Sequence, residues 1–444
     1  MAAKKSESAR PVLQVIRTKA ETAIAAEISG SESRLPGNAG VRALRQKAAK
    51  SFVAAGLPHR RIEAWKYTDI RQLQAEHYPF GSGGIAGSQA IAEVLGETLP
   101  GFDADTFLFV DGALVTSTMP KGIEALPLDK ALADPPDWVE AQLVGAAKSG
   151  DATLVLNTAA MSGGICLRIA DGTELEKPVH LIFHATHPEP RSVATRVIVA
   201  VGKGAKVTLV ESHDLRRRQV NAVCQIAIAD GGAVTHVTNL KLDAASIHLA
   251  HHLVTLGANA TYKPFQLSTG EGLLRTDIAI DFDGQHSSFD LAGAALVSGN
   301  GHADTTLVVD HKVPHCTSRE LFKCVLDGEA KGVFQGKVIV RPHAQKTDGK
   351  QMAKALLLSE TAEFDAKPEL EIYADDVICG HGATSMQLDD DQLFYFLSRG
   401  IPKAEARAML TEAFVTEAID TVEHEALRDA LKVRARGWLM SDRT

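Results

Sequence analysis

The fold is decided by three related turns in the middle of the chain: Gly202-Lys203-Gly204-Ala205, Asp230-Gly231-Gly232-Ala233 and Gly257-Ala258-Asn259-Ala260. Two similar turns follow at Asn300-Gly301-His302-Ala303 and Asp327-Gly328-Glu329-Ala330. The closing alanines lie 28 and 27 residues apart in the first three turns and 27 apart in the last two, with 43 residues between the third and the fourth. A near-constant interval lets like residues stack from coil to coil. A β-sandwich would instead show turn signals every 8 to 12 residues without the longer interval.

Short aliphatic and β-branched runs alternate at period two around these turns, from about residue 151 to 378, with Leu154-Val155-Leu156 the first of them. The sequence therefore predicts a mainly β protein with a right-handed parallel β-helix core. Helical patterns flank it, and residues 11–56 predict two helices broken at Leu35-Pro36-Gly37-Asn38. The predicted regions are an N-terminal helical region (1–150), the β-helix (151–388) and a C-terminal helical region (389–444).

Composition narrows the class of function. The net charge of -8 offers no basic field for nucleic acid, and five cysteines without a framework spacing fit a reducing compartment. The first ten residues are polar, and no run of about 18 apolar residues suggests a membrane span, so we expect a cytoplasmic protein. The phosphate-binding pattern G-x-x-x-x-G-K-[ST] is absent, so ATP hydrolysis would belong to a partner.

The segment Cys379-Gly380-His381-Gly382 closes the strand-rich region. Residues two apart in an extended backbone point the same way, so the Cys379 thiol and the His381 imidazole should project from one face. Gly380 and Gly382 remove side-chain bulk, which lets another backbone approach. Two ligands are fewer than a zinc site needs, and no second cysteine or histidine cluster lies nearby. The pair is either a packed strand end or part of a metal site.

Other possible metal ligands have simpler interpretations. His311, His315 and Cys316 lie close in sequence, but Pro314 makes a local turn, so their side chains need not converge. His251 and His252 are adjacent in a strand-like run, which predicts one ring on the surface and one in the core. Three more cysteines lie among aliphatic residues and are expected to be buried small hydrophobes: Cys166, Cys224 and Cys324.

Two aromatic or apolar segments complete the pattern. The stretch from Arg60 to Asp69 contains Trp65 and Tyr67 and predicts a packing anchor between helix and loop. After the β region, Asp389 and its acidic neighbours can cap a helix that ends near Gly400. An apolar stripe in the following helix either packs on the last coil or offers a surface to a partner: Ala406, Met409, Leu410, Ala413 and Phe414.

In combination and in order, several segments make the chain resemble the SufB/SufD family of the SUF iron-sulfur cluster assembly machinery over nearly its whole length. They are Glu63-Ala64-Trp65-Lys66-Tyr67-Thr68, Gly336-Lys337-Val338-Ile339-Val340, Ala344-Gln345-Lys346-Thr347-Asp348, Leu356-Leu357-Leu358-Ser359, Pro368-Glu369-Leu370-Glu371-Ile372, Cys379-Gly380-His381-Gly382-Ala383-Thr384 and Leu393-Phe394-Tyr395 through Ser398-Arg399-Gly400-Ile401. The SufD branch is the better match. SufB typically carries carboxylates beside the histidine, where this chain has Gly380 and Gly382, and an early cysteine cluster, whereas this chain has no cysteine before Cys166.

The resemblance implies a non-catalytic scaffold subunit that pairs with SufB through the β-helix and binds the ATPase SufC through its C-terminal helices. His381, with Cys379 beside it, would then lie at the interface where a nascent iron-sulfur cluster forms, as a partial site that the partner completes. No permanently bound cofactor is implied, and the isolated chain could pair with itself through the same edge. The implied ATPase-binding residues are Leu393, Phe394, Phe396, Arg399, Met409, Leu410 and Phe414. The alternative is a solitary β-helix enzyme, a lyase or esterase, acting on polysaccharide.

Overall fold

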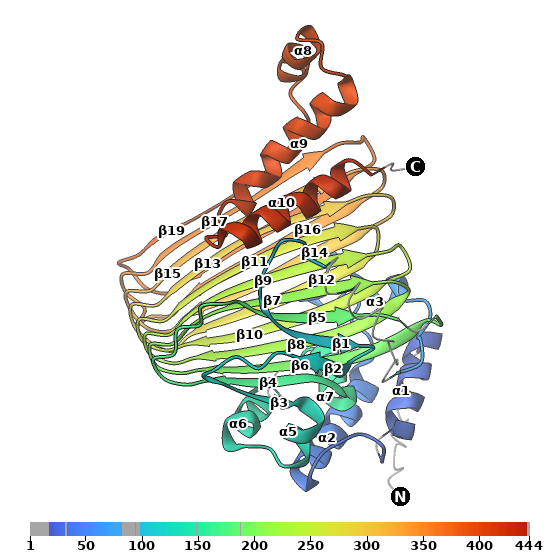
Figure 1. The fold of residues 1–444 in the computed structure, drawn as a ribbon, viewed down its shortest axis with the longest axis vertical. Helices are drawn as coiled ribbons and strands as arrows, with labels where there is room; N and C mark the ends of the chain where they lie inside the picture. The colour runs from blue at the N-terminus through green and yellow to red at the C-terminus, as the bar shows by residue number, and fades with distance from the viewer. Residues whose placement is uncertain are drawn as a thin grey trace, which may run out of the picture.

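A computed structural model of the 444-residue chain describes residues 17–31, 33–81, 94, 98–146, 150–186 and 188–441. The polar first ten residues lie outside the described residues. Within the described residues the chain forms one long β-solenoid with helices at the N-terminal end and along one flank (Figure 1). None of the described helices combines the length and the apolar character that crossing a bilayer requires.

Two sheets form the solenoid, and from β4 onward the chain passes from one to the other at every strand. In the described residues one sheet has the order β19-β17-β15-β13-β11-β9-β7-β5-β1-β2, and the other has the order β18-β16-β14-β12-β10-β8-β6-β4-β3. Pairing is parallel from β4 to β19, so the predicted parallel β-helix is confirmed. The strands are β1 (Asp105–Val110), β2 (Ala113–Ser117), β3 (Ile123–Pro127), β4 (Gly163–Ile169), β5 (Val179–His184), β6 (Arg191–Val201), β7 (Lys206–Leu215), β8 (Arg218–Ile228), β9 (Ala233–Leu242), β10 (Ile247–Leu256), β11 (Thr261–Gly270), β12 (Leu273–Phe282), β13 (Ser288–Val297), β14 (His302–His311), β15 (Thr317–Leu326), β16 (Lys331–Val340), β17 (Asp348–Leu357), β18 (Glu363–Ile372) and β19 (Ile378–Met386).

The repeated turns form the corners of the coil. The first three lead from β6 to β7, from β8 to β9 and from β10 to β11, all at one corner. The last two lead from β13 to β14 and from β15 to β16, at the opposite corner, which explains the irregular 43-residue interval. Every coil from β6 to β17 has a left-handed residue at the first corner: Gly204, Gly231, Asn259, His286, His315 and Lys346. Glycine and asparagine suit that conformation, whereas histidine and lysine adopt it at a cost.

Alternate residues of each strand fill the lumen between the two sheets. The apolar part of this interior includes Val199, Phe282, Phe289 and Val338, all nearly inaccessible to solvent. Because side chains alternate between faces, the other half of each strand packs under helices or meets solvent. Burial of this many aliphatic and aromatic groups, coil upon coil, is the main stabilising term of the fold.

Helices and three strands cover the N-terminal end. The expected pair of helices appears as α1 and α2, and the Asn38 side chain caps α2 by accepting from the Val41 amide. The helices are α1 (Lys19–Ser31), α2 (Ala39–Ala55), the 3-10 helix η1 (Glu63–Trp65), α3 (Ile70–Leu73), α5 (Leu128–Ala133), α6 (Asp137–Ala146) and α7 (Ala152–Ala160). Strands β1, β2 and β3 interrupt the N-terminal region, which was expected to be helical.

One predicted strand is wrong. Leu154-Val155-Leu156 lies in α7, which begins at Asp151 because that carboxylate accepts from the Thr153 and Leu154 amides. A short apolar run that is buried on all sides has no periodicity with which to distinguish helix from strand. Here α7 is enclosed by α2 and the outer face of the solenoid, so nearly every residue in it is buried.

Trp65 anchors η1 to the solenoid, as expected of this segment. Its indole Nε1 donates to Asp151 at 3.0 Å, and its ring lies 3.8 Å from the guanidinium carbon of Arg275. Arg275 in turn pairs with Asp277 and Asp304 and donates to a backbone carbonyl of η1. The N-terminal region is therefore joined to β12 and β14 by a buried charged network under an aromatic ring.

Three helices follow the last strand: α8 (Asp390–Ser398), α9 (Lys403–Ile419) and α10 (Glu425–Leu439). Asp389 caps α8 as predicted, and α8 projects away from the body of the molecule (Figure 1). The end of α9 and all of α10 pack along the outer face of the ten-stranded sheet, against residues such as Val237, Phe265 and Val325. These helices therefore lie along the flank of the solenoid. The two terminal strands, β18 and β19, pair with no further strand in the described residues.

Candidate functional site

Cys379 and His381 lie on β19, the last strand of the ten-stranded sheet. Their neighbours on β17 are Gly349 and Gln351, which are buried inside the coil. Alternation therefore directs both side chains toward the lumen, and Cys379 packs against its apolar cluster. Because no strand follows β19 in the described residues, this part of the lumen is open, and His381 is exposed while Cys379 is half-buried.

The surroundings of Cys379 favour its thiol form. Burial raises the pKa of Cys379, and the hydrogen bond from the Gly349 backbone opposes that rise only in part. A thiol of this kind is a weak nucleophile at neutral pH and becomes a thiolate when a cation binds it. Space around the pair is open, since a side chain added at Gly380 would meet nothing within 4 Å. A partner surface could therefore approach β19 closely.

Two buried polar residues lie beneath His381 in the same column of the sheet. The register pairs His381 with Gln351, and Gln351 with Glu320 on β15. The Gln351 amide has no hydrogen-bond partner among the described residues, and the Glu320 carboxyl has the Ser318 hydroxyl beside it. Burial raises the pKa of Glu320 to about 8, which keeps it protonated at neutral pH. Gly336 makes room for the amide, because a Cβ there would lie 1.9 Å from the Gln351 nitrogen.

The sequence interpretation missed this column. Its members lie one coil apart, so the interval between the repeated turns was the signal that could have found them. A buried carboxyl group and a buried amide without a partner both cost free energy of folding.

The histidines and the cysteine near Pro314 do not converge. His311 is buried and stacks on Phe282 with ring centroids 4.3 Å apart, whereas His315 is exposed at a corner and stacks on His286. Cys316 is buried and its thiol lies 3.5 Å from a backbone carbonyl. These side chains lie apart, as the local turn indicated.

His251 and His252 point to opposite faces, as expected, but the prediction that one of them lies on the surface is wrong. His251 is buried under α7, where it bonds the Thr153 hydroxyl at 2.7 Å, and His252 lies in the lumen. The sequence could not show this because α7 itself was taken for a strand. Three cysteines are buried as predicted: Cys166, Cys224 and Cys324.

The residues expected to bind an ATPase partner differ in how accessible they are. Phe394 on α8 is 70% exposed, Arg399 is also exposed, and Met409 on α9 is 41% exposed. Leu393 is buried. The other three residues, Phe396, Leu410 and Phe414, are half-buried. Phe414 packs toward the sheet, and the Lys323 ammonium lies over its ring.

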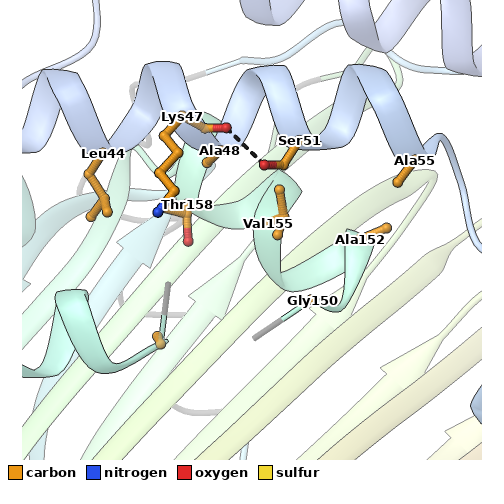
Figure 2. A pocket seen from close by; sticks show the side chains of 10 residues that line it. Leu44, Lys47, Ala48, Ser51, Ala55, Gly150, Ala152, Val155 and Thr158 are labelled. Carbon is orange, nitrogen blue, oxygen red and sulfur yellow. Dashed lines mark hydrogen bonds between the residues drawn. The ribbon is translucent and has the colours of Figure 1, made fainter. Parts of the chain in front are cut away.

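Several hollows lie away from β19, among them two that border helices. The one between α2 and α7 measures about 100 Å³ and is lined by small and apolar groups, with the Ser51 hydroxyl already donating to the Lys47 carbonyl (Figure 2). This lining has no acid-base pair. The second, of about 840 Å³, lies between α9 and the end of α10, where Met409 and Arg436 line it. It extends the exposed surface of the C-terminal helices.

The fold and the pair on β19 define a class: a β-solenoid whose open end carries a thiol and an imidazole on one face of its last strand. The SUF system FeS cluster assembly SufBD core domain matches residues 183–414, and the SufBD protein N-terminal region matches residues 36–181. The chain belongs to the SufBD family of the SUF system of iron-sulfur cluster assembly.

Individual relatives agree with this assignment. The chain is 30% identical over 426 residues to an iron-sulfur cluster assembly SufBD family protein of Synechocystis, covering 92% of each protein. It is 30% identical over 400 residues to the iron-sulfur cluster assembly protein SufD of Escherichia coli, covering 88% of this chain and 91% of that protein. Protein ABCI7, chloroplastic, of Arabidopsis thaliana is 26% identical over 419 residues. The chain is a SufD homologue.

Proposed function

We propose that this chain is a non-catalytic scaffold subunit of the SUF complex, which forms a cluster assembly site with SufB and engages the ATPase SufC. The observation that carries the proposal is the open end of the solenoid, where Cys379 and His381 face an accessible lumen beside an unpaired strand edge. A thiol and an imidazole suit iron and its sulfides, and a partner would supply the remaining ligands. The iron and sulfur are cargo in this scheme.

The open end is suited to pairing with another solenoid. Unpaired strand edges attract further strands, and apolar side chains surround this one: Ile372, Tyr373, Ile378 and Met386 are all more than 40% exposed. Addition of a partner strand to β19 would continue the ten-stranded sheet across the interface. The same edge would serve SufB in the complex and a second copy of this chain in isolation.

The C-terminal helices support the second contact. Phe394, Tyr395 and Leu397 on α8 are exposed together, on a helix that projects from the body. The end of α9 is fixed to the sheet, because Lys323 and Lys354 both pair with Glu417. A movement of SufC on α8 would thus be transmitted to the solenoid, and ATP hydrolysis would belong to SufC.

Co-expression with candidate SufB and SufC proteins tests the proposed function. The chain should co-purify with both as a stable complex. Failure to bind either partner would contradict the scaffold role.

His381→Ala tests the proposed assembly site. The variant should fold and form the complex but lose most cluster production, measured by iron and sulfide content and by the visible absorption of the reconstituted complex. His343→Ala removes another exposed histidine and is the matched control. Normal cluster yield in a verified His381→Ala complex would remove this residue from the site.

A further inference from the structure

A second group of metal-ligating side chains lies deep inside the solenoid, far along the lumen from β19. Glu211 on β7, Cys224 on β8 and His236 on β9 each offer a ligand atom, and these atoms all lie within 4.8 Å of one another. All three side chains are buried, with at most 4% of each residue exposed. We call these three residues the lumen cluster.

Further imidazoles surround the lumen cluster. His252 on β10 is the direct register neighbour of Cys224, and its ring centroid lies 5.2 Å from that of His236. His213 places its Nε2 atom 3.6 Å from a Glu211 oxygen. Three histidines, a carboxylate and a thiol therefore lie together in the apolar interior of the solenoid.

The contacts of His236 orient it as a metal ligand would be oriented. Its Nε2 faces Glu211 Oε1 at 2.8 Å, and its Nδ1 lies 2.9 Å from the Tyr262 hydroxyl. Because a carboxylate only accepts, Nε2–H donates to Glu211. A metal bound at Nε2 would take the place of that proton, with Nδ1–H donating to the Tyr262 oxygen. Metal-binding histidines are typically held in this way by an outer partner on the second ring nitrogen.

Unpartnered nitrogens supply an independent indication of a ligand. His248 is 2% exposed, yet neither of its ring nitrogens has a hydrogen-bond partner among the described residues. Its ring centroid lies 4.9 Å from that of His213, whose Nδ1 is also without a described partner. Buried polar atoms are nearly always satisfied, so this group of imidazoles lacks something that would complete it.

We propose that Glu211, Cys224 and His236, with His252 as the fourth donor, form a buried site for a divalent transition-metal ion such as iron or zinc. Thiolate, imidazole and carboxylate together select borderline metals of this kind. The net charge of the ligands also favours binding of a divalent ion. One carboxylate and one thiolate neutralise a divalent cation, and a neutral site costs least in a low-dielectric interior. The Cys224 thiol releases its proton when the metal binds.

A small cavity at the solenoid wall adjoins the outer imidazole of this group. This cavity of about 20 Å³, room for about one water molecule, is lined by Phe183, His184 and His213. His213 is the neighbour of Glu211, so an ion that entered there would meet the outer imidazole first. The Arg218–Asp111 ion pair, at 3.3 Å, borders the same cavity and would have to shift to admit an ion.

Cobalt(II) is the probe. Purified full-length protein, freed of metal by chelator and refolded with Co²⁺, should bind one ion tightly. It should also show the near-ultraviolet charge-transfer band of a cobalt-thiolate bond and intense visible bands of tetrahedral cobalt. Zn²⁺ should displace the bound Co²⁺ and so remove these bands. Because binding favours the folded state, added metal should also raise the unfolding temperature.

Variants assign the signal to the lumen. Cys224→Ser should abolish the charge-transfer band and the metal-dependent rise in unfolding temperature. Cys324→Ser, at another buried cysteine, is the matched control and should keep both. Tyr262→Phe removes the outer partner of His236 and should weaken Co²⁺ binding by about tenfold while keeping the spectrum. Circular dichroism confirms that each variant is folded.

A double variant, Cys379→Ala with His381→Ala, separates this site from the one on β19. It should retain the full cobalt signal, so the lumen site stands or falls independently of the proposed assembly function. If the folded wild type binds no Co²⁺, or if Cys224→Ser gives an unchanged spectrum, the lumen site is overturned. A signal that disappears in the double variant and persists in Cys224→Ser would likewise assign the metal to β19.

Discussion

Glu320 is a carboxyl group buried in the lumen, beside the Ser318 hydroxyl and near the charges of Arg319 and Asp290. Burial is the largest effect on its pKa and outweighs the guanidinium. The folded protein therefore keeps a proton on this group over a pH range in which the unfolded chain loses it. Such a group makes stability depend on pH in a definite direction.

We predict that Glu320→Gln stabilises the protein at neutral pH and has little effect below about pH 4.5. As pH rises from 4.5, the ordinary value for this group, to about 8, the unfolded wild type ionises and the folded wild type does not, so stability falls. Removing the carboxyl should recover on the order of 3 kcal/mol at pH 7. Denaturant unfolding at several pH values measures this, with exposed Glu329→Gln as control. Parallel pH profiles for wild type and Glu320→Gln would contradict the prediction.

For individual residues, the sequence could predict that Cys379 and His381 share a face, because alternation within one strand needs no tertiary information. It could not show that Glu320 and Gln351 lie in the same column as His381. Columns depend on register between strands, and register depends on the length of every intervening corner.

Among the elements, η1 depends on one side chain. We predict that Trp65→Ala destabilises the protein by about 3 to 5 kcal/mol. The substitution removes a buried indole, the ring that covers the Arg275 guanidinium and the hydrogen bond to Asp151. Trp65→Phe should cost less, since a ring still covers the guanidinium. Thermal and denaturant unfolding compare the two variants, and wild-type stability in Trp65→Ala would refute the anchoring role.

The projecting helix α8 should contribute to binding and little to folding. Phe394→Ala is expected to weaken SufC binding at least about tenfold, as loss of an exposed aromatic anchor does, without lowering the unfolding temperature. Titration calorimetry measures the affinity. Val144→Ala, at an exposed apolar residue on α6, is the control and should bind normally. Equal affinities for both variants would exclude Phe394 from the contact.

Helices α2 and α8 were predictable from the sequence, whereas α7, which has no distinguishing pattern, was not. Asp389 accepts from amides of the first turn of α8, as the sequence indicated, and Asn38, which lies in the predicted break between two helices, does the same for α2. In α7 the apolar run carries no period, so only its enclosure by α2 and the solenoid decides its conformation. The packing of α10 along the sheet also depends on tertiary structure alone.

For the whole molecule, the open end predicts self-association. The isolated chain should form dimers that Ile378→Lys converts to monomers, because an ammonium on an edge strand opposes strand addition. Sedimentation or light scattering measures the mass. Ile62→Lys, at an exposed isoleucine near η1, is the control and should remain dimeric. A wild type that is monomeric at high concentration would count against pairing through β19.

The overall architecture was the most predictable feature, since the repeated turns reflect the coil directly. Their irregular interval had a structural cause, because the later turns belong to the opposite corner. The sequence left open whether the apolar stripe of residues 406–414 packs on the last coil or offers a surface to a partner. The end of α9, with Phe414, and α10 contact Val237 and Phe265 along the flank of the solenoid, whereas Met409 stays exposed.

The repeated corners, each with a left-handed residue, restrict which insertions and deletions this fold tolerates. Inserting one residue within a strand would exchange inward and outward side chains for the rest of that strand, expelling ligands such as His236 from the interior. An insertion or deletion spanning one complete coil, such as the 27 residues between Gly204 and Gly231, would preserve every lateral pairing. Natural changes in length should therefore occur in whole coils or as excursions at the corners.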